Sequence, residues 1–145
     1  MSKPILMSIK PRYSHEIITQ NKKIEIRKKI GKYFTPNSYI FIYSSSPEKK
    51  IIGFFQIDAI IRFDKDSIDD NLLLKSCLTK KEMIDYIENE KAFGIKIKNV
   101  NVIQPITLDE MKTLFKDFTP PQSFRYIDPN MLVFLKKRLK GNAIP

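Results

Sequence analysis

Three strand-like segments follow one another between residues 22 and 63, with no helical segment between them. Residues 22–28, "KKIEIRK", alternate charged and apolar side chains with a period of two. Residues 39–45, "YIFIYSS", and 51–63, "IIGFFQIDAIIRF", are rich in β-branched and aromatic residues. A doubly wound parallel sheet needs a helix after each strand, so this order argues against one. It predicts an α+β domain built on a mixed or closed β-sheet.

The first of the flanking segments extends this prediction to the N-terminal side. Residues 5–9, "ILMSI", are typical of a short buried strand that ends at Lys10-Pro11, and Pro11 suits the start of a helix of about ten residues. The run at 51–63 is longer than a typical strand. We therefore expect Gly53 to mark a bulge or a tight bend, as glycine residues do in the strands of barrels.

The C-terminal half mixes helical and extended patterns. Residues 67–90 look helical, and Thr79 followed by Glu82 has capping-box spacing. Strand alternation returns at 92–103, a short helix is expected at 107–115 with Thr107 as its N-cap, and a last helix at 128–139. We expect residues 119–127 to be irregular or extended because of two prolines. With no repeat and no linker, the chain is predicted to be a single domain over 1–145 with a helical insert at about 64–90.

The charge of the chain is large and unevenly distributed. Lys and Arg number 26 against 16 acidic residues, a formal net charge of +10, which points to a polyanionic partner. The predicted insert differs, because its eight acidic residues and four lysines give it a net charge of −4. A basic body with one acidic flank is the pattern expected of a protein with a directed anion-binding face.

Composition also narrows the kinds of site and location. One Cys and one His exclude a disulfide within the chain and argue against a Cys/His zinc site, so we expect no metal and no cofactor. Phosphate-binding glycine loops and the common hydrolase motifs are absent from the sequence. No apolar run approaches the roughly 20 residues of a membrane span, and the N-terminus has no extended apolar leader or cleavage site. We therefore expect a cytoplasmic protein that does not insert into membranes.

The basic segment at 21–29, "NKKIEIRKK", has two interpretations. The first is an edge strand with one solvated, charged face. The second is a pocket, since Lys23, Glu25 and Arg27 share a face and the carboxylate can fix the Arg27 rotamer while leaving guanidinium donors free. A carboxylate between two cations is also held ionised.

Residues 8–28, "SIKPRYSHEIITQNKKIEIRK", resemble the opening of the ASCH domains, a branch of the PUA-like superfamily. Lys22, Glu25 and Arg27 match the family's GxKxxExR signature, with Gln20 in place of the glycine. Residues 39–57 are similar to the family's next two strands, and "PPQSFRYI" (120–127) to a late segment of a bacterial and phage-associated subgroup. The resemblance covers roughly residues 5–63 and 92–127, and it implies a small mixed β-barrel flanked by helices.

The resemblance also implies a cleft between the first helix, the signature strand and the barrel mouth that takes RNA or a modified nucleotide. Phe124 would offer a stacking surface for a base or, equally, plug the core. The implied ligand-binding residues are Lys10, Lys22, Glu25, Arg27, Ser44, Ser45, Ser123 and Phe124.

Enzymatic activity is the alternative to simple binding. One ASCH group hydrolyses acetylated cytidine with a lysine, a threonine nucleophile and a glutamate. Lys22 matches that lysine, but Glu25 stands at the threonine position and is a poor substitute for an activated hydroxyl. Other members are regarded as ribonucleases, for which Tyr13 and Lys22 are the candidate acid–base residues.

Three hypotheses follow from the sequence. The leading one is an RNA- or modified-nucleotide-binding module with a regulatory role. The second is a small hydrolase acting on RNA or on a modified nucleoside. The third is an accessory protein that binds a protein partner through the acidic insert at 64–90.

Overall fold

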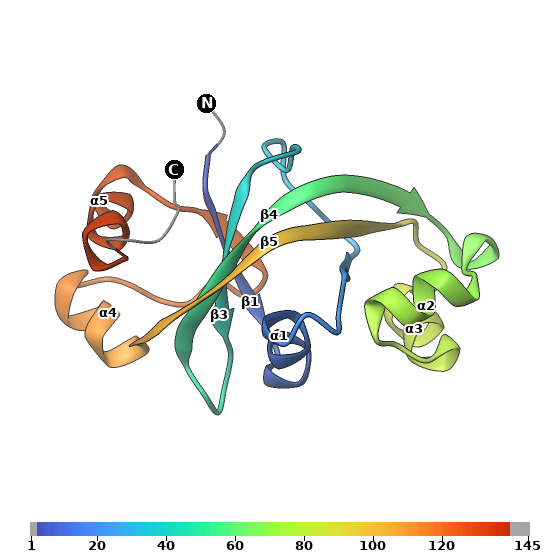
Figure 1. Ribbon diagram of the computed structural model, residues 1–145, viewed down its shortest axis with the longest axis horizontal. Helices are drawn as coiled ribbons and strands as arrows, with labels where there is room; N and C mark the ends of the chain where they lie inside the picture. The colour runs from blue at the N-terminus through green and yellow to red at the C-terminus, as the bar shows by residue number, and fades with distance from the viewer. Residues whose placement is uncertain (1–2, 140–145) are drawn as a thin grey trace.

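A six-stranded mixed sheet forms the frame of the protein in the computed structural model, which describes residues 3–139 (Figure 1). The strand order is β2-β5-β4-β3-β1-β6, with β1 and β3 parallel and the other neighbours antiparallel. The sheet curls into a half-barrel, so the predicted α+β class is confirmed. The strands are β1 (Ile5–Ile9), β2 (Ile24–Arg27), β3 (Tyr39–Ser44), β4 (Lys50–Phe63), β5 (Ala92–Thr107) and β6 (Phe124–Tyr126).

Apart from α1, the helices lie at the two ends of the long β4–β5 pair. In Figure 1, α2 and α3 lie at one end of this pair, α4 and α5 at the other, and α1 lies beside the middle of the sheet. The helices are α1 (Pro11–Ile18), α2 (Asp70–Ser76), α3 (Lys80–Ile87), α4 (Leu108–Leu114) and α5 (Pro129–Arg138), with a 3-10 turn η1 (Lys65–Ser67) before α2. In the described part of the chain, no helix is long and apolar enough to cross a membrane.

The run that is too long for a typical strand is one continuous strand, β4, because bulges bend it. The register against β5 shifts at three places, one of them between Ile51 and Gly53. A Cβ on Gly53 would come within 2.5 Å of the Asn101 backbone oxygen and 2.7 Å of Ile18 Cδ1. Gly53 therefore marks the expected bulge, and it lets β5 and α1 approach the bent strand closely.

The Pro-rich segment before the last helix contains one element that the sequence did not predict. Residues 124–126 form the edge strand β6, which pairs antiparallel with β1 from Ile5↔Tyr126 to Met7↔Phe124. The prediction of an irregular segment holds only for the residues around Pro120 and Pro121. A three-residue edge strand has too short an alternation to be recognised beside two prolines.

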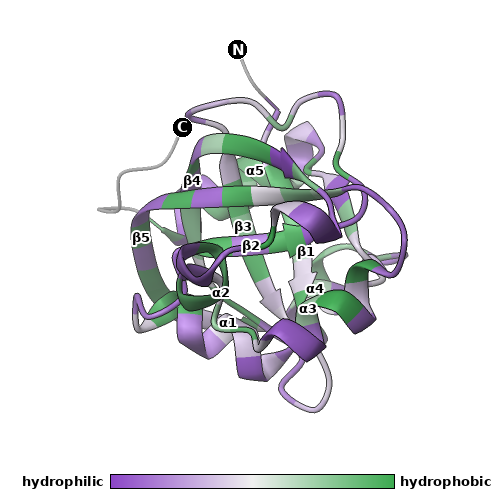
Figure 2. Ribbon diagram, turned by 90° about the vertical axis from the view of Figure 1, so that its right-hand side faces the viewer, coloured by the Kyte–Doolittle hydropathy of each residue, from purple (hydrophilic) through white to green (hydrophobic). Residues whose placement is uncertain are grey.

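Three apolar clusters support the elements that carry the cleft. One packs α4 and α5 on the sheet, and a second packs α1, through Ile17, against the strands in the middle of the sheet. The third joins β2 to the helices of the insert, with Ile24 and Ile26 against Met83 and Ile87. Figure 2 shows the resulting alternation of hydrophobic and hydrophilic bands along β4 and β5. Since β2 buries its isoleucines on α2 and α3, its other face, with Glu25 and Arg27, turns towards the cavity.

The helix starts follow the sequence signals. Thr79 accepts a hydrogen bond from the Glu82 backbone N–H while the Glu82 carboxylate accepts one from Thr79 N–H, a complete capping box. Thr107 caps α4 through Glu110 N–H, as predicted. These caps set α3 and α4 at the positions from which both contribute to the cavity wall.

Candidate functional site

A cavity of about 500 Å³ opens between α1, β2 and the insert helices. Its lining comes from segments far apart in the chain, including the first strand, the β3–β4 turn, α3 and the Pro-rich segment before β6. It brings together six of the residues predicted to bind a ligand or to act in catalysis on RNA, which are Lys10, Tyr13, Lys22, Glu25, Arg27 and Ser45. The signature strand is therefore a cavity wall rather than a solvated edge.

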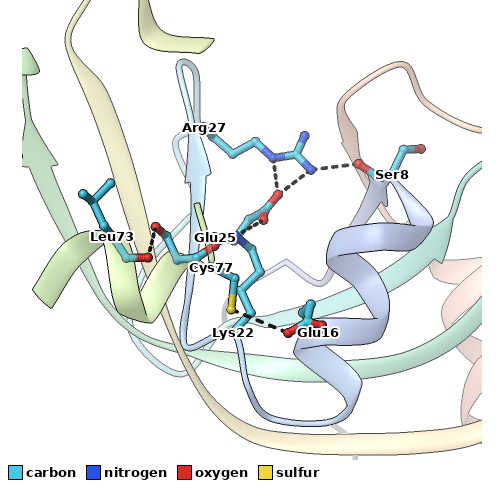
Figure 3. Close-up of polar contacts among 8 residues, drawn as sticks. Ser8, Glu16, Lys22, Glu25, Arg27, Leu73 and Cys77 are labelled. Atoms are coloured by element: carbon cyan, nitrogen blue, oxygen red, sulfur yellow. Dashed lines mark hydrogen bonds and ion pairs between the residues drawn. The ribbon is translucent and has the colours of Figure 1, made fainter. Parts of the chain in front are cut away.

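Lys22 lies almost entirely out of water, with 2% of its surface exposed. Its Nζ donates to the backbone oxygen of Ser76 and lies 3.7 Å from Glu25 Oε1 (Figure 3). The same nitrogen lies 5.0 Å from the centre of the Tyr13 ring. Burial lowers the pKa of the Lys22 ammonium, and the nearby Glu25 carboxylate opposes that change.

Glu25 is held between two cations, but one of them is not the residue expected. Its Oε2 accepts from Arg27 Nε at 2.9 Å, and its Oε1 faces Lys22. Lys23, which shares the strand face by alternation, is exposed. The chain turns after α1 through Gln20, which has φ 65°, and this turn directs Lys22 inward beside the strand. The expectation of a carboxylate between two cations is met by Lys22 and Arg27, not by Lys23.

Arg27 is more fully engaged than the strand pattern indicated. Nε binds Glu25, Nη2 donates to Ser8 O at 2.8 Å, and Nη1 donates to Ser123 Oγ at 3.2 Å (Figure 3 shows the first two). All three guanidinium nitrogens have a protein acceptor, so the expectation that Glu25 leaves them free is not met. Arg27 is therefore a rigid, positively charged part of the wall.

Cations and aromatic rings surround this buried core of the site. Lys10 and Lys49 are both exposed and both line the cavity, from the start of α1 and from the β3–β4 turn. Three tyrosines also line it: Tyr13, Tyr43 and Tyr86. Tyr43 is buried, and burial raises the pKa of its hydroxyl. Ammonium groups at the rim and aromatic faces inside are the combination that single-stranded nucleic acids contact.

An ion pair between α1 and α3 borders the cavity. Arg12 Nη1 donates to Glu82 Oε2 at 2.5 Å and Nη2 to Oε1 at 3.2 Å, a two-point contact between residues 70 positions apart. The hydrogen bond from Arg12 lowers the pKa of the Glu82 carboxyl to about 2. The acidic insert thus binds the basic body of its own chain, and Lys28 adds contacts of 3.8 Å to both Glu88 and Glu90.

Three predicted ligand-binding residues lie outside the cavity lining. Ser44 is fully buried, and its hydroxyl bonds Ser14 and Glu48. Ser123 meets the site only through Arg27. Phe124 packs on Phe34 with ring centres 4.7 Å apart. Of the two roles that the sequence allowed for Phe124, base stacking and core packing, this contact corresponds to core packing.

The single histidine and cysteine do not meet. His15 Nε2 lies 2.6 Å from Glu48 Oε2 at the surface, whereas the Cys77 thiol faces Glu16 at 3.7 Å. Burial raises the pKa of the Cys77 thiol, so it is a weak nucleophile. Within residues 3–139, no group of three His, Cys, Asp or Glu side chains is arranged to hold a metal ion.

Several lining residues had no sequence signal of their own. Ser8, Lys49, Tyr43, Glu82 and Tyr86 reach the cavity through contacts between distant segments. Lys49 and Tyr43 lie in the segment that resembles the family's middle strands. Comparing these two positions with the corresponding positions of other family members could have identified them as lining residues. Glu82 was recognised only as a helix cap.

No protein-family model matches the chain. A curated protein from Zymomonas mobilis, an ASCH domain-containing ribonuclease, is 29% identical over 126 residues, which cover 86% of this chain and 84% of that protein.

The fold gives a consistent result. The crystal structure of ASCH from Zymomonas mobilis matches with a TM-score of 0.85 and 28% identity, covering 93% of this chain and 94% of that one. The N-terminal domain of Staphylothermus marinus McrB matches with a TM-score of 0.59 at 13% identity over 95% of both chains, a likeness of fold alone.

Proposed function

We propose that this chain, which the sequence and structural matches assign to the ASCH domain family, binds RNA or a modified nucleotide in the cavity between α1, β2 and α3. The observation that carries the proposal is the cavity itself. It combines a buried Lys22–Glu25–Arg27 network with exposed Lys10 and Lys49 at its rim.

The two parts of the site have different tasks in this proposal. The rim lysines attract phosphate groups, an interaction that carries no sequence information and weakens with salt. The buried network keeps a fixed arrangement of charge against which the polar edge of a base is selected. The name of the Zymomonas mobilis relative, a ribonuclease, supports RNA as the nucleic acid.

The test is the binding of a fluorescent single-stranded RNA across a range of salt concentrations, measured by anisotropy. The parent protein should bind more weakly as salt rises. Lys10→Gln and Lys49→Gln should each reduce the slope of log affinity against log salt by about 0.7. Lys136→Gln, which removes an equal charge from exposed α5, is the matched control and should leave the slope unchanged.

Single-stranded DNA of the same sequence separates the two nucleic acids. Equal binding of DNA and RNA would remove the claim of RNA selectivity. If both rim variants bind as the parent does, the ligand does not enter this cavity.

The alternative activity is hydrolysis in the same cavity, of RNA or of a modified nucleoside. The observation in its favour is the pair formed by Lys22 and Tyr13, with the ammonium nitrogen 5.0 Å from the ring centre and the pKa of Lys22 lowered by burial. A lysine pKa shifted towards neutrality suits proton transfer better than an ordinary one.

Incubation with a labelled RNA pool and with acetylated cytidine, in the presence of a chelator, distinguishes hydrolysis from binding. Tyr13→Phe removes one hydroxyl and keeps the ring beside Lys22, so it is the matched variant. If the parent protein turns over a substrate and Tyr13→Phe does not, the cavity is catalytic. If both proteins show only background turnover, hydrolysis is excluded for these substrates and the binding function stands.

A protein partner for the acidic insert stays a prediction. Three of its acidic residues, Glu82, Glu88 and Glu90, already face cations of the basic body. Removing the insert would therefore also disturb the cavity, so a pulldown must use surface substitutions such as Asp69→Asn or Asp85→Asn instead.

A further inference from the structure

A second basic and aromatic site lies outside the cavity, on the loop that follows β2. The ammonium nitrogens of Lys3 and Lys32 lie 5.0 and 5.6 Å from the centre of the same ring, that of Tyr33. Both lysines are exposed, and neither makes an ion pair with a carboxylate within the described residues. Two exposed ammonium groups beside one ring form a local positive charge that attracts an anion such as a phosphate group, an interaction that salt weakens.

The loop that carries Lys32 and Tyr33 is fixed by contacts with β6, whereas Lys3 approaches the ring from the segment before β1. The Tyr33 backbone N–H donates to the Tyr126 hydroxyl at 3.0 Å, and the two rings meet edge to face at 5.4 Å. Gly31 passes so close that a Cβ there would lie 2.1 Å from the same hydroxyl. Phe34 is 5% exposed and packs on Phe124. The Tyr33 ring is therefore a fixed aromatic platform, and the ammonium groups of Lys3 and Lys32 lie beside it.

The platform and the cavity are attached to the two ends of one short strand. Ser123, just before β6, accepts from the cavity residue Arg27, while Tyr126, at the end of β6, receives the Tyr33 loop. Ser123 and Tyr126 are three positions apart in the chain, which corresponds to about 10 Å in an extended strand. A spacing of about 10 Å corresponds to about three nucleotides of one strand at about 3.4 Å each, so a chain of several nucleotides is long enough to span it.

We infer that Lys3, Tyr33 and Lys32 form a phosphate clamp for the backbone of single-stranded RNA as the strand leaves the cavity. This inference rests on the proposed function, since it assigns the path of the same ligand. The clamp carries no sequence information, because it contacts phosphate rather than bases. Its effect is to increase affinity for a chain of several nucleotides over a single one.

The experiment compares a mononucleotide with a single-stranded RNA of about ten nucleotides, for the parent and for the variant Lys3→Gln with Lys32→Gln. We expect the double variant to bind the mononucleotide as the parent does. It should bind the longer RNA roughly tenfold more weakly, and its salt slope should be smaller by about 1.4. Lys136→Gln with Lys137→Gln, the matched double variant on α5, should bind both ligands as the parent does.

Tyr33 is tested separately because its ring positions the two charges. Tyr33→Phe keeps the ring and should bind the longer RNA as the parent does, whereas Tyr33→Leu should lose affinity for that RNA only. The midpoint of thermal unfolding of each variant shows whether a loss reflects unfolding.

The outcomes separate the inference from the function on which it rests. If the clamp variants bind the longer RNA like the parent while the Lys10→Gln and Lys49→Gln variants weaken it, the clamp is wrong and the cavity stands. If the parent binds neither ligand, the proposed function fails. Equal losses for the α5 control pair and the clamp pair would show a general charge effect and overturn the clamp.

Discussion

Arg27 on β2 donates a hydrogen bond from Nη2 to the backbone oxygen of Ser8 on β1, across 2.8 Å. β2 is one edge of the curled sheet, and β1 lies next to the other edge, β6. The bond therefore joins the two sides of a half-barrel that backbone pairing leaves open. The residue that supplies charge to the cavity wall also holds the fold together at that wall.

Replacing Arg27 by lysine should destabilise the protein while keeping the charge. A lysine cannot reproduce the fork that serves Glu25, Ser8 and Ser123 at once, and hydrogen bonds from charged groups contribute about 1.5–3 kcal/mol each. We expect Arg27→Lys to lower the free energy of unfolding by about 2–4 kcal/mol in urea titration. Exposed Lys29→Ala is the neighbouring control, and a similar loss there would contradict the explanation.

Glu25→Gln should be among the most costly single changes in the cavity. It leaves the Lys22 ammonium and the Arg27 guanidinium buried without a compensating carboxylate, which typically costs about 3–5 kcal/mol. Adding Lys22→Met removes one uncompensated charge and should recover a large part of the loss. A double-mutant cycle measures this coupling, and strictly additive losses would show that Lys22 and Glu25 do not interact.

The Arg12–Glu82 ion pair should make stability depend on pH in the acid range. The folded-state pKa of Glu82 is about 2, below its ordinary value of 4.5. The contribution of the pair is therefore complete above about pH 5 and is lost as pH falls towards 2. Unfolding in urea from about pH 7 to about pH 2.5 should show a steeper loss for the parent than for Glu82→Gln. Glutamine at this position still completes the capping box, and parallel curves would contradict the prediction.

Gln20 has a left-handed backbone conformation, with φ 65°, where the signature that this chain resembles has glycine. Gln20→Gly relieves that conformation but increases the freedom of the unfolded chain. We expect the two effects to leave stability within about 1 kcal/mol of the parent or slightly above it. Gln20→Val should instead lose about 1–2 kcal/mol, because a β-branched residue tolerates positive φ poorly. Thermal unfolding of both variants gives the comparison, and equal stability would show that the turn relaxes.

Gly31 tests the close approach of its loop to Tyr126. Gly31→Ala places a Cβ 2.1 Å from the Tyr126 hydroxyl, so we expect a loss of about 1–3 kcal/mol. Tyr126→Phe removes that oxygen and the bond to Tyr33 N–H, at a cost of about 1 kcal/mol. The combined variant should be more stable than the sum of the two losses predicts, as measured by chemical unfolding. Additive losses would place the steric conflict elsewhere.

The sequence alone determined the local features of this protein. Period-two alternation predicted β2, capping residues predicted the starts of α3 and α4, and Gly53 predicted a bulge. These features depend on residues that are close together in the chain, so a short stretch of sequence is enough to predict them. The resemblance to ASCH domains rested on a spacing of the same local kind and is confirmed by the sequence and structural matches.

The tertiary structure decided which charges meet. Lys22, not Lys23, became the partner of Glu25, because the turn at Gln20 lies outside the strand pattern. Ser76 accepts a hydrogen bond from Lys22, and Glu82 lines the cavity and pairs with Arg12, although each partner lies more than 50 positions away in the chain. Contacts of this kind depend on how the helices pack on the sheet. That packing is determined by buried side chains from all parts of the chain, so no short stretch of sequence predicts it. The signature strand thus identified the wall of the site and the resemblance supplied Lys10, whereas the enclosure by the helices at 70–87 and the position of Lys49 at the rim came only from the fold.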